Sequence, residues 1–237
     1  MNKIHINPRE QSFPMFSIGP ANFMKLNVPL ISQEKDSVLC GVAGVRMLLG
    51  YYGINKSEDE LAKDVEVYPD WGTYMPQLGN YLINNGFQVE IITANPKMFG
   101  VRDFSKGPQQ LTETLSEFLN QTKSQKDKRV VSHYLNFLKI GGLMSVRIPT
   151  DKDIEAEIKS ERPLLAELTT NFLLGLRRDV NFHFNVITGI DGEYIYVNDP
   201  LEDVGKQKYL IQDFMFGMYA SSYGSPDEGC LMKVRKP

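Results

Sequence analysis

A cysteine at the start of an apolar helix is the first feature of this chain that suggests catalysis. Cys40 stands directly before Gly41 and a run over 42–52 whose apolar residues repeat at helical spacing. A thiol in the first turn of a helix faces the positive end of the helix dipole, which favours the thiolate. The backbone N–H of Cys40 is also a donor that the helix leaves unpaired. One residue can therefore supply both a nucleophile and a donor to the oxyanion of an attacked carbonyl.

The residues around Cys40 support a catalytic role for it, whereas the second cysteine is expected to be structural. We expect Gly41 to leave room for a substrate to approach the backbone. Gln33, seven residues before Cys40, is a candidate for a second oxyanion donor through its side-chain amide, and the alternative is a solvated loop amide. Cys230 lies in an apolar, strand-like segment, where a free cysteine usually acts as a small buried hydrophobe.

A thiolate nucleophile needs a base, and the chain has three histidines. His5 lies in an irregular, proline-containing arm. His133 lies on a predicted helix, where we expect it to be half exposed. His183 opens the first of two late strands and has the best context for a base, although a single histidine is more often structural.

The two late strands, 181–190 and 193–199, surround Asp191-Gly192, which is a strong hairpin signal. A two-residue turn would place His183 and Asp199 on opposite faces, because side chains alternate along a strand. A three-residue loop at 191–193 or a bulge would place them on one face. We expect the second register, in which Asp199 orients the His183 imidazole. The alternative for Asp199 is a turn residue before a proline.

The other elements must position these groups. Helices are predicted at 41–52, at 57–65 with a Ser57/Glu60 capping box, before Gly86 within 70–93, at 107–122, at 129–142 and at the start of 151–168. Strands are predicted at 25–31, after Gly86, at the end of 151–168, in the two late segments and at 228–234. The charged run 123–129 is interpreted as a solvated loop. Helices come early and antiparallel strands late, so the predicted class is α+β.

Length and composition limit the number of domains, the kinds of partner and the expected location of the protein. The chain has 237 residues, 42% hydrophobic and 23% charged, with a net charge of −3. We expect one domain over 1–237, and no strong field that would attract nucleic acid or anionic lipid. No apolar run is fit for a signal peptide or a membrane span, and two cysteines make no disulfide framework. The expected location is cytoplasmic.

Three segments together resemble a known family. They are "CGVAGVRMLLGYYG" with the preceding glutamine, "GTYMPQLGNYLINNGFQVEII" and "HFNVITGIDGEYIYVNDP". They resemble the papain-like cysteine peptidases of the bacteriocin-processing, double-glycine leader class, and above all the stand-alone C39-like domains. The resemblance covers about 25–93 and 150–200.

The resemblance implies a papain-like fold, in which a helical half carries the nucleophile and packs on a mainly antiparallel sheet. It implies Cys40 as nucleophile, His183 as base, Asp199 as orienter and Gln33 as oxyanion donor. The substrate would be a peptide or amide, cleaved through a thioester acyl-enzyme. No metal or organic cofactor is implied.

The chain also departs from the family pattern. The family glutamine usually stands six residues before the cysteine, so loop 34–39 is expected to bulge or to hold Gln33 away from the pocket. Leader-processing members are typically joined to a membrane transporter, which these residues do not include. The arm 1–26 and the segment 97–148, expected to be a helical insertion, have no recognised counterpart. We expect the helical segment 108–140 within the insertion to pack beside the cleft and narrow it, with a decoration far from the site as the alternative.

The expected function is a cysteine-dependent hydrolase of peptide or amide bonds. A transferase in which an amine resolves the thioester would use the same residues. A non-catalytic binding domain of the same fold is the third alternative. The sequence leaves the oligomeric state open.

Overall fold

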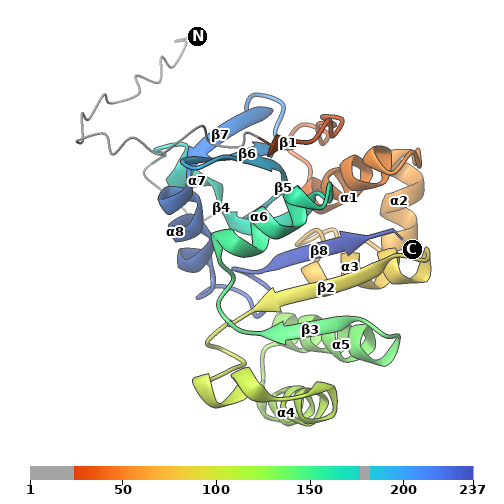
Figure 1. Cartoon of the computed structure of the whole chain (residues 1–237). Helices are drawn as coiled ribbons and strands as arrows, with labels where there is room; N and C mark the ends of the chain where they lie inside the picture. The colour runs from red at the N-terminus through yellow and green to blue at the C-terminus, as the bar shows by residue number, and fades with distance from the viewer. Residues whose placement is uncertain (1–23, 177–181, 237) are drawn as a thin grey trace.

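A computed structural model of the chain describes residues 24–176 and 182–236. At its centre is a sheet built from β1 (Met24–Lys25), β2 (Gln88–Thr93), β3 (Leu143–Val146), β4 (Leu164–Thr169), β5 (Phe182–Ile190), β6 (Tyr194–Asn198), β7 (Lys206–Leu210) and β8 (Leu231–Arg235). The strand order is β3-β2-β8-β4-β5-β6-β7, with β1 paired to β5 (Figure 1). Among these strands, every pair is antiparallel except β2 and β3.

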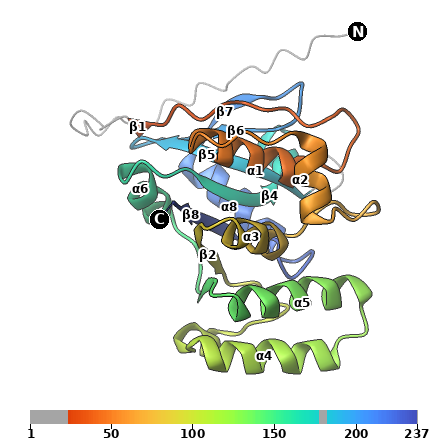
Figure 2. The same ribbon diagram turned by 90° about the vertical axis from the view of Figure 1, so that its right-hand side faces the viewer.

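Helices cover both faces of this sheet. They are α1 (Cys40–Tyr51), α2 (Glu58–Val65), α3 (Met75–Asn84), the 3-10 helix η1 (Val101–Ser105), α4 (Pro108–Gln121), α5 (Gln125–Lys139), α6 (Asp151–Lys159), α7 (Thr170–Leu173) and α8 (Ile211–Ser221). Helices α1, α3 and α5 lie on one face, and α6 and α8 lie on the other (Figures 1 and 2). Helix α4 packs on α5 as the outermost element (Figure 2).

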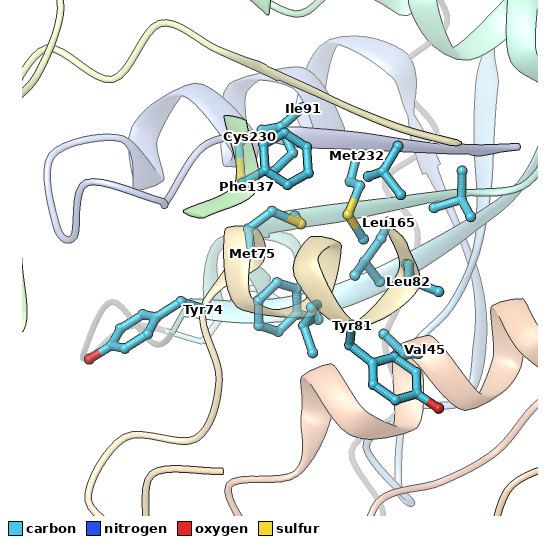
Figure 3. Close-up of a cluster of buried hydrophobic side chains, with 14 of the residues drawn as sticks. Val45, Tyr74, Met75, Tyr81, Leu82, Ile91, Phe137, Leu165, Cys230 and Met232 are labelled. Atoms are coloured by element: carbon cyan, nitrogen blue, oxygen red, sulfur yellow. The ribbon is translucent and has the colours of Figure 1, made fainter. Parts of the chain in front are cut away.

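Burial on both faces explains why the central strands are almost continuously apolar. Ile91 and Leu165 belong to the core under α1 and α3, whereas their neighbours Ile92 and Leu164 belong to the core under α6 and α8. Side chains of adjacent strand residues point to opposite faces, so a strand covered on both sides needs apolar residues at successive positions. Figure 3 shows the first core, in which Cys230 lies among the apolar side chains.

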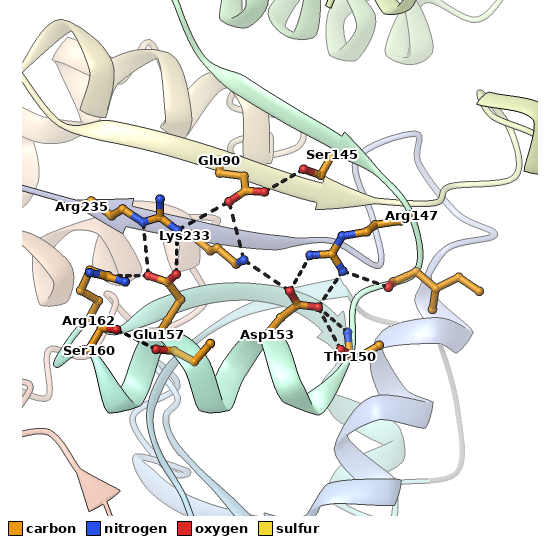
Figure 4. A network of polar contacts seen from close by, with 12 residues as sticks. Glu90, Ser145, Arg147, Thr150, Asp153, Glu157, Ser160, Arg162, Lys233 and Arg235 are labelled. Carbon is orange, nitrogen blue, oxygen red and sulfur yellow. Dashed lines mark hydrogen bonds and ion pairs between the residues drawn. The ribbon is translucent and has the colours of Figure 1, made fainter. Parts of the chain in front are cut away.

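Helix α6 is also held over the β2–β8 half of the sheet by charge. Asp153 on α6 accepts hydrogen bonds from Arg147 and lies 3.3 Å from the Lys233 ammonium on β8 (Figure 4). One turn further along, Glu157 pairs with Arg235 on β8 at 2.8 Å and with Arg162 at 2.6 Å. The network fixes the register of α6 on the strands beneath it.

The predicted α+β class is confirmed. The Ser57/Glu60 capping box is also confirmed: the Ser57 hydroxyl accepts from the Glu60 N–H, and the Glu60 carboxylate accepts from the Ser57 N–H. In addition, no described helix is long and apolar enough to cross a membrane.

Several predicted boundaries are wrong. The strand expected at 25–31 ends at Lys25; Leu26 still donates to the Thr188 carbonyl, but the carbonyls of Val28 and Pro29 accept from the Asn198 side chain and not from a neighbouring strand. Most of the charged run 123–129 is helical, since Ser124 caps α5 and accepts from the Asp127 N–H.

The segment 97–148 is not wholly helical, because β3 within it joins the sheet beside β2. Strand β7 and helix α8 were not predicted. Most of the expected arm 1–26, including His5, lies outside the described residues.

Candidate active site

Cys40 is the first residue of α1, as its position in the sequence predicted. Its side chain is partly exposed. Helix α1 packs on β5, which brings Cys40 to the start of that strand. The side chain of His183 and the backbone of Phe184 and Gly41 lie close enough to the thiol to lower its pKa. The N–H of Cys40 itself has no partner within the helix, because a helix leaves its first donors unpaired.

Gly41 has a different role from the one expected of it. A Cβ at this position would lie 2.1 Å from the Thr73 hydroxyl oxygen and 2.9 Å from a methyl group of Leu78. The space beside Gly41 is therefore filled by the protein itself, and is not open to a substrate. The glycine lets the start of α1 approach the segment before α3.

A bulge in β5 brings His183 and Asp199 to one face of the hairpin. Beyond the bulge the strands pair Gly189 with Tyr196, but before it they pair Ile187 with Val197. Thr188 is thus an extra residue without a partner on β6. Continued along the strands, the register of the Ile187–Val197 pair sets Asp199 opposite residue 185. The side chain of Asp199 therefore points to the same face as that of His183.

The same-face register was expected, with either a three-residue loop or a bulge as its cause, and the structure has the bulge. In the turn itself, Asp191 accepts from the N–H groups of Glu193 and Tyr194.

Asp199 makes a direct hydrogen bond with His183. Its Oδ1 lies 2.8 Å from His183 Nε2 and also accepts from the Leu201 N–H at 2.8 Å. Asp199 is completely buried. Because Nε2 is engaged by Asp199, Nδ1 is the ring nitrogen left to face Cys40. The neighbouring Asn198 points elsewhere and donates to backbone carbonyls.

The electrostatics of the site favour a charged pair. Burial raises the pKa of Cys40, but the hydrogen bond and charge of His183, together with the backbone donors, bring it below the ordinary value. Burial lowers the pKa of His183, but Asp199 and Cys40 raise it to about 10. These opposite shifts favour thiolate and imidazolium at neutral pH. By contrast, burial and neighbouring carboxylates raise the pKa of Cys230 well above the ordinary value.

Gln33 lines the same cavity as Cys40 and His183. Its side-chain amide donates to the Ser37 carbonyl at 2.8 Å, so one of its two N–H bonds is committed to its own loop. Loop 34–39 contains a turn, in which the Ser37 N–H donates to the Glu34 carbonyl and Asp36 is left-handed with φ 59°. Gln33 N donates to the Pro200 carbonyl, which ties this loop to the segment after Asp199.

The cavity around these residues has a volume of about 460 Å³. Its rim includes Asp70 and Trp71, which the sequence did not single out. Helix α5 holds this rim: Lys126 lies over the Trp71 ring, 3.1 Å from its centroid, and Arg129 pairs with Asp70 at 3.4 Å. The segment 97–148 therefore contacts one side of the cleft.

His133 lies away from Cys40, in an aromatic cluster with Tyr68 and Tyr74. Its Nε2 lies 3.1 Å from the Tyr68 hydroxyl. The cluster gives His133 a packing role at the junction of α3 and α5. Across residues 24–176 and 182–236, no three His, Cys, Asp or Glu side chains form a group that could hold a metal ion.

Comparisons with known proteins identify the family and the fold. A family model described as the peptidase C39-like family matches residues 25–226. A solved Bacillus anthracis structure, described as a C39-like peptidase, is 15% identical and has a TM-score of 0.50, covering 91% of this chain and 98% of the other. The predicted papain-like fold is confirmed.

Two further solved structures have lower TM-scores of 0.46. A double glycine motif protease from an AMS/PCAT transporter, solved with the leader peptide, is 17% identical, covering 93% of this chain and 99% of the other. The peptidase domain of Streptococcus ComA is 13% identical, covering 88% and 98%. None of the curated proteins compared with this chain matches it.

Proposed function

The chain belongs to the peptidase C39-like family, and we propose that it is a cysteine peptidase in which Cys40, His183 and Asp199 cleave a peptide or amide bond. Family and fold together indicate cysteine peptidase activity. One observation carries the assignment of residues: the buried His183 ring is hydrogen-bonded to Asp199 and lines one cavity with Cys40, whose pKa it lowers. A histidine with a purely structural role would not need a neighbouring cysteine whose pKa is lowered.

In the proposed reaction the Cys40 thiolate attacks the carbonyl carbon of the substrate, and the carbonyl oxygen becomes an oxyanion. The N–H of Cys40 and the remaining amide N–H of Gln33 are the proposed donors to that oxygen. The His183 imidazolium gives its proton to the leaving amine, and the C–N bond breaks to leave a thioester. Asp199 keeps the ring oriented and stabilises its positive charge.

Water completes the cycle. Neutral His183 takes a proton from the attacking water, whose oxygen bonds to the thioester carbon. Collapse of this second intermediate releases a carboxylic acid and restores the thiolate beside an imidazolium. If an amine took the place of water, the same residues would transfer the acyl group. Analysis of the products with and without an added amine separates the two outcomes.

The proposal is tested by treating the native protein with a peptidyl electrophile and measuring intact mass. We expect one adduct, located on Cys40 by peptide mapping. Cys40→Ala should abolish the adduct, and Cys230→Ala, the matched control, should leave it unchanged. An adduct that forms equally on both cysteines, or none in the folded protein, would argue for a non-catalytic domain.

A further inference from the structure

Glu167 is a carboxylate in the cleft that the proposed reaction does not use. It lies on β4 directly opposite Phe184 on β5, and both residues line the same cavity as Cys40, whose pKa the Phe184 backbone helps to lower. Paired residues of antiparallel strands have Cα atoms about 5 Å apart, so Glu167 lies within one side-chain length of the reacting sulfur. It lines the cavity with 5% of its surface exposed. The one described partner of its carboxylate is the Cys230 thiol, at 4.0 Å.

Two more buried acids lie behind Glu167. Asp227 accepts from the N–H of Met75 through Oδ2, but its Oδ1 has no hydrogen bond among the described residues. Glu228 has an ion pair with Lys126 at 3.7 Å and no hydrogen bond to its carboxylate within the same part of the chain. The charge of Lys126 also acts on Glu167 and lowers its pKa, but no described cation lies within ion-pair distance of the Glu167 carboxylate.

This arrangement is electrostatically unsatisfied on the cavity side. Burial raises the pKa of Glu167 well above its usual range, and the charges of Asp227 and Glu228 raise it further. A cation placed in the cavity beside Glu167 would reverse both effects, because it would favour the charged carboxylate. An apolar side chain would leave Glu167 protonated and neutral, because a buried acid without a nearby cation takes up a proton.

We propose that Glu167 forms a subsite for the lysine or arginine side chain of the substrate residue that supplies the attacked carbonyl. This inference rests on the proposed peptidase function. That residue has its Cα bonded to the carbon that meets Cys40, and Glu167 lines the same cavity as Cys40, so the substrate side chain can extend to the carboxylate. A long cationic side chain reaches the carboxylate and forms a charge-assisted hydrogen bond. The substrates are peptides with a basic residue on the acyl side of the cleaved bond.

The test uses two peptidyl chloromethyl ketones that differ at one residue. One carries lysine beside the reactive carbon, and the other carries norleucine, which has a similar length and no charge. Each alkylates a thiolate by forming a sulfur–carbon bond with loss of chloride. Intact mass gives the rate of Cys40 alkylation in the full chain. We expect the lysine probe to react faster by roughly tenfold or more.

Glu167→Gln should remove this preference, so that the ratio of the lysine rate to the norleucine rate falls to about one. The matched control is Glu113→Gln, which removes one negative charge from the exposed face of α4. If Glu167→Gln does not fold, the wild-type protein still tests the subsite. Its lysine preference should increase with pH, since Glu167 must ionise to attract the cation.

The possible results distinguish failure of the proposed subsite from failure of the proposed peptidase function. Equal rates for both probes in the wild-type protein overturn the subsite and leave the peptidase proposal standing. A lysine preference that survives Glu167→Gln, or that is flat with pH, overturns the role of Glu167. Failure of both probes to label Cys40 overturns the proposed function and the subsite together.

Discussion

His183 and Asp199 are joined by a 2.8 Å hydrogen bond because Thr188 forms a bulge in the strand that carries the histidine. If Thr188 were paired in the ladder, the register on the turn side of the bulge would continue along the hairpin and set Asp199 opposite residue 186. Asp199 would then lie on the opposite face from the imidazole. One residue outside the strand ladder therefore determines whether a carboxylate can orient the ring.

Asp199→Asn should slow the reaction of Cys40 with a peptidyl electrophile by roughly 100-fold or more. The amide lacks the charge that stabilises the imidazolium, and an amide N–H facing the ring favours the wrong tautomer. The pKa of His183, about 10 in the wild-type protein, should fall in the variant. Rates measured between pH 5 and pH 10 check both effects. Asp203→Asn, a change in the exposed loop nearby, is the control, and equal rates for both variants would remove the orienting role.

The two cysteines should differ in reactivity at pH 6. Iodoacetamide should modify Cys40 first, because its lowered pKa leaves more thiolate at that pH. Cys230 is fully buried and has a raised pKa, so it should react slowly until the protein unfolds. His183→Ala should remove most of the advantage of Cys40, and denaturant should abolish the remainder. Peptide mapping gives the extent at each site, and comparable labelling in the native protein would contradict an activated thiol.

Trp71 should report directly on the cleft, because it is the one tryptophan of the sequence and lines the cavity. Lys126→Ala removes the ammonium that lies over its ring, so the emission spectrum should change in intensity and wavelength. Cys40 alkylation by a peptidyl probe should also change the emission. Lys123→Ala, at an exposed position before α5, is the control. A spectrum insensitive to both changes would show that Trp71 is not at the occupied rim.

Gly41→Ala should destabilise the protein and slow Cys40 alkylation, because the new methyl group overlaps the Thr73 hydroxyl. Thr73 Oγ1 has no hydrogen-bond partner among the described residues, so Thr73→Ala should cost little by itself. The double variant should therefore recover part of the lost stability and rate. Gly107→Ala, where no atom lies near the added carbon, serves as the control in urea denaturation. Strictly additive effects of the two changes would contradict the contact.

Asp153→Asn should lower the free energy of unfolding at pH 7 by about 1–3 kcal/mol, since it breaks the pairs with Arg147 and Lys233. Hydrogen bonds and nearby cations hold the pKa of Asp153 below its usual range despite burial. A lowered pKa gives stability that is present above the ordinary value near 4 and is lost as pH falls through the folded-state value. The difference between variant and wild type should therefore shrink in acid.

Urea denaturation at several pH values measures this difference. Glu155→Gln is the matched control on the same helix, because Glu155 is exposed and pairs with Lys159 alone along the helix surface. A pH-independent loss in Asp153→Asn would mean that the loss comes from the helix cap at Thr150, not from the ion pairs.

The sequence by itself determined the local elements and the order of the reactive groups. Helical spacing after Cys40, the capping box at Ser57 and the hairpin signal at Asp191-Gly192 each depend on interactions within a few residues of chain. Such interactions can be predicted from residue types. They were sufficient to place a thiol at a helix start and an imidazole at a strand start. The resemblance of these segments to a known family then predicted the fold.

Tertiary structure decided what depends on residues far apart in the chain. The bulge at Thr188, the filling of the space beside Gly41 by Thr73 and the position of β3 beside β2 follow from packing across the sheet. Glu167 reaches the cleft for the same reason, since strand pairing sets it opposite Phe184. Residue types do not encode these contacts locally, because each needs two distant segments to be brought together by burial of a shared core.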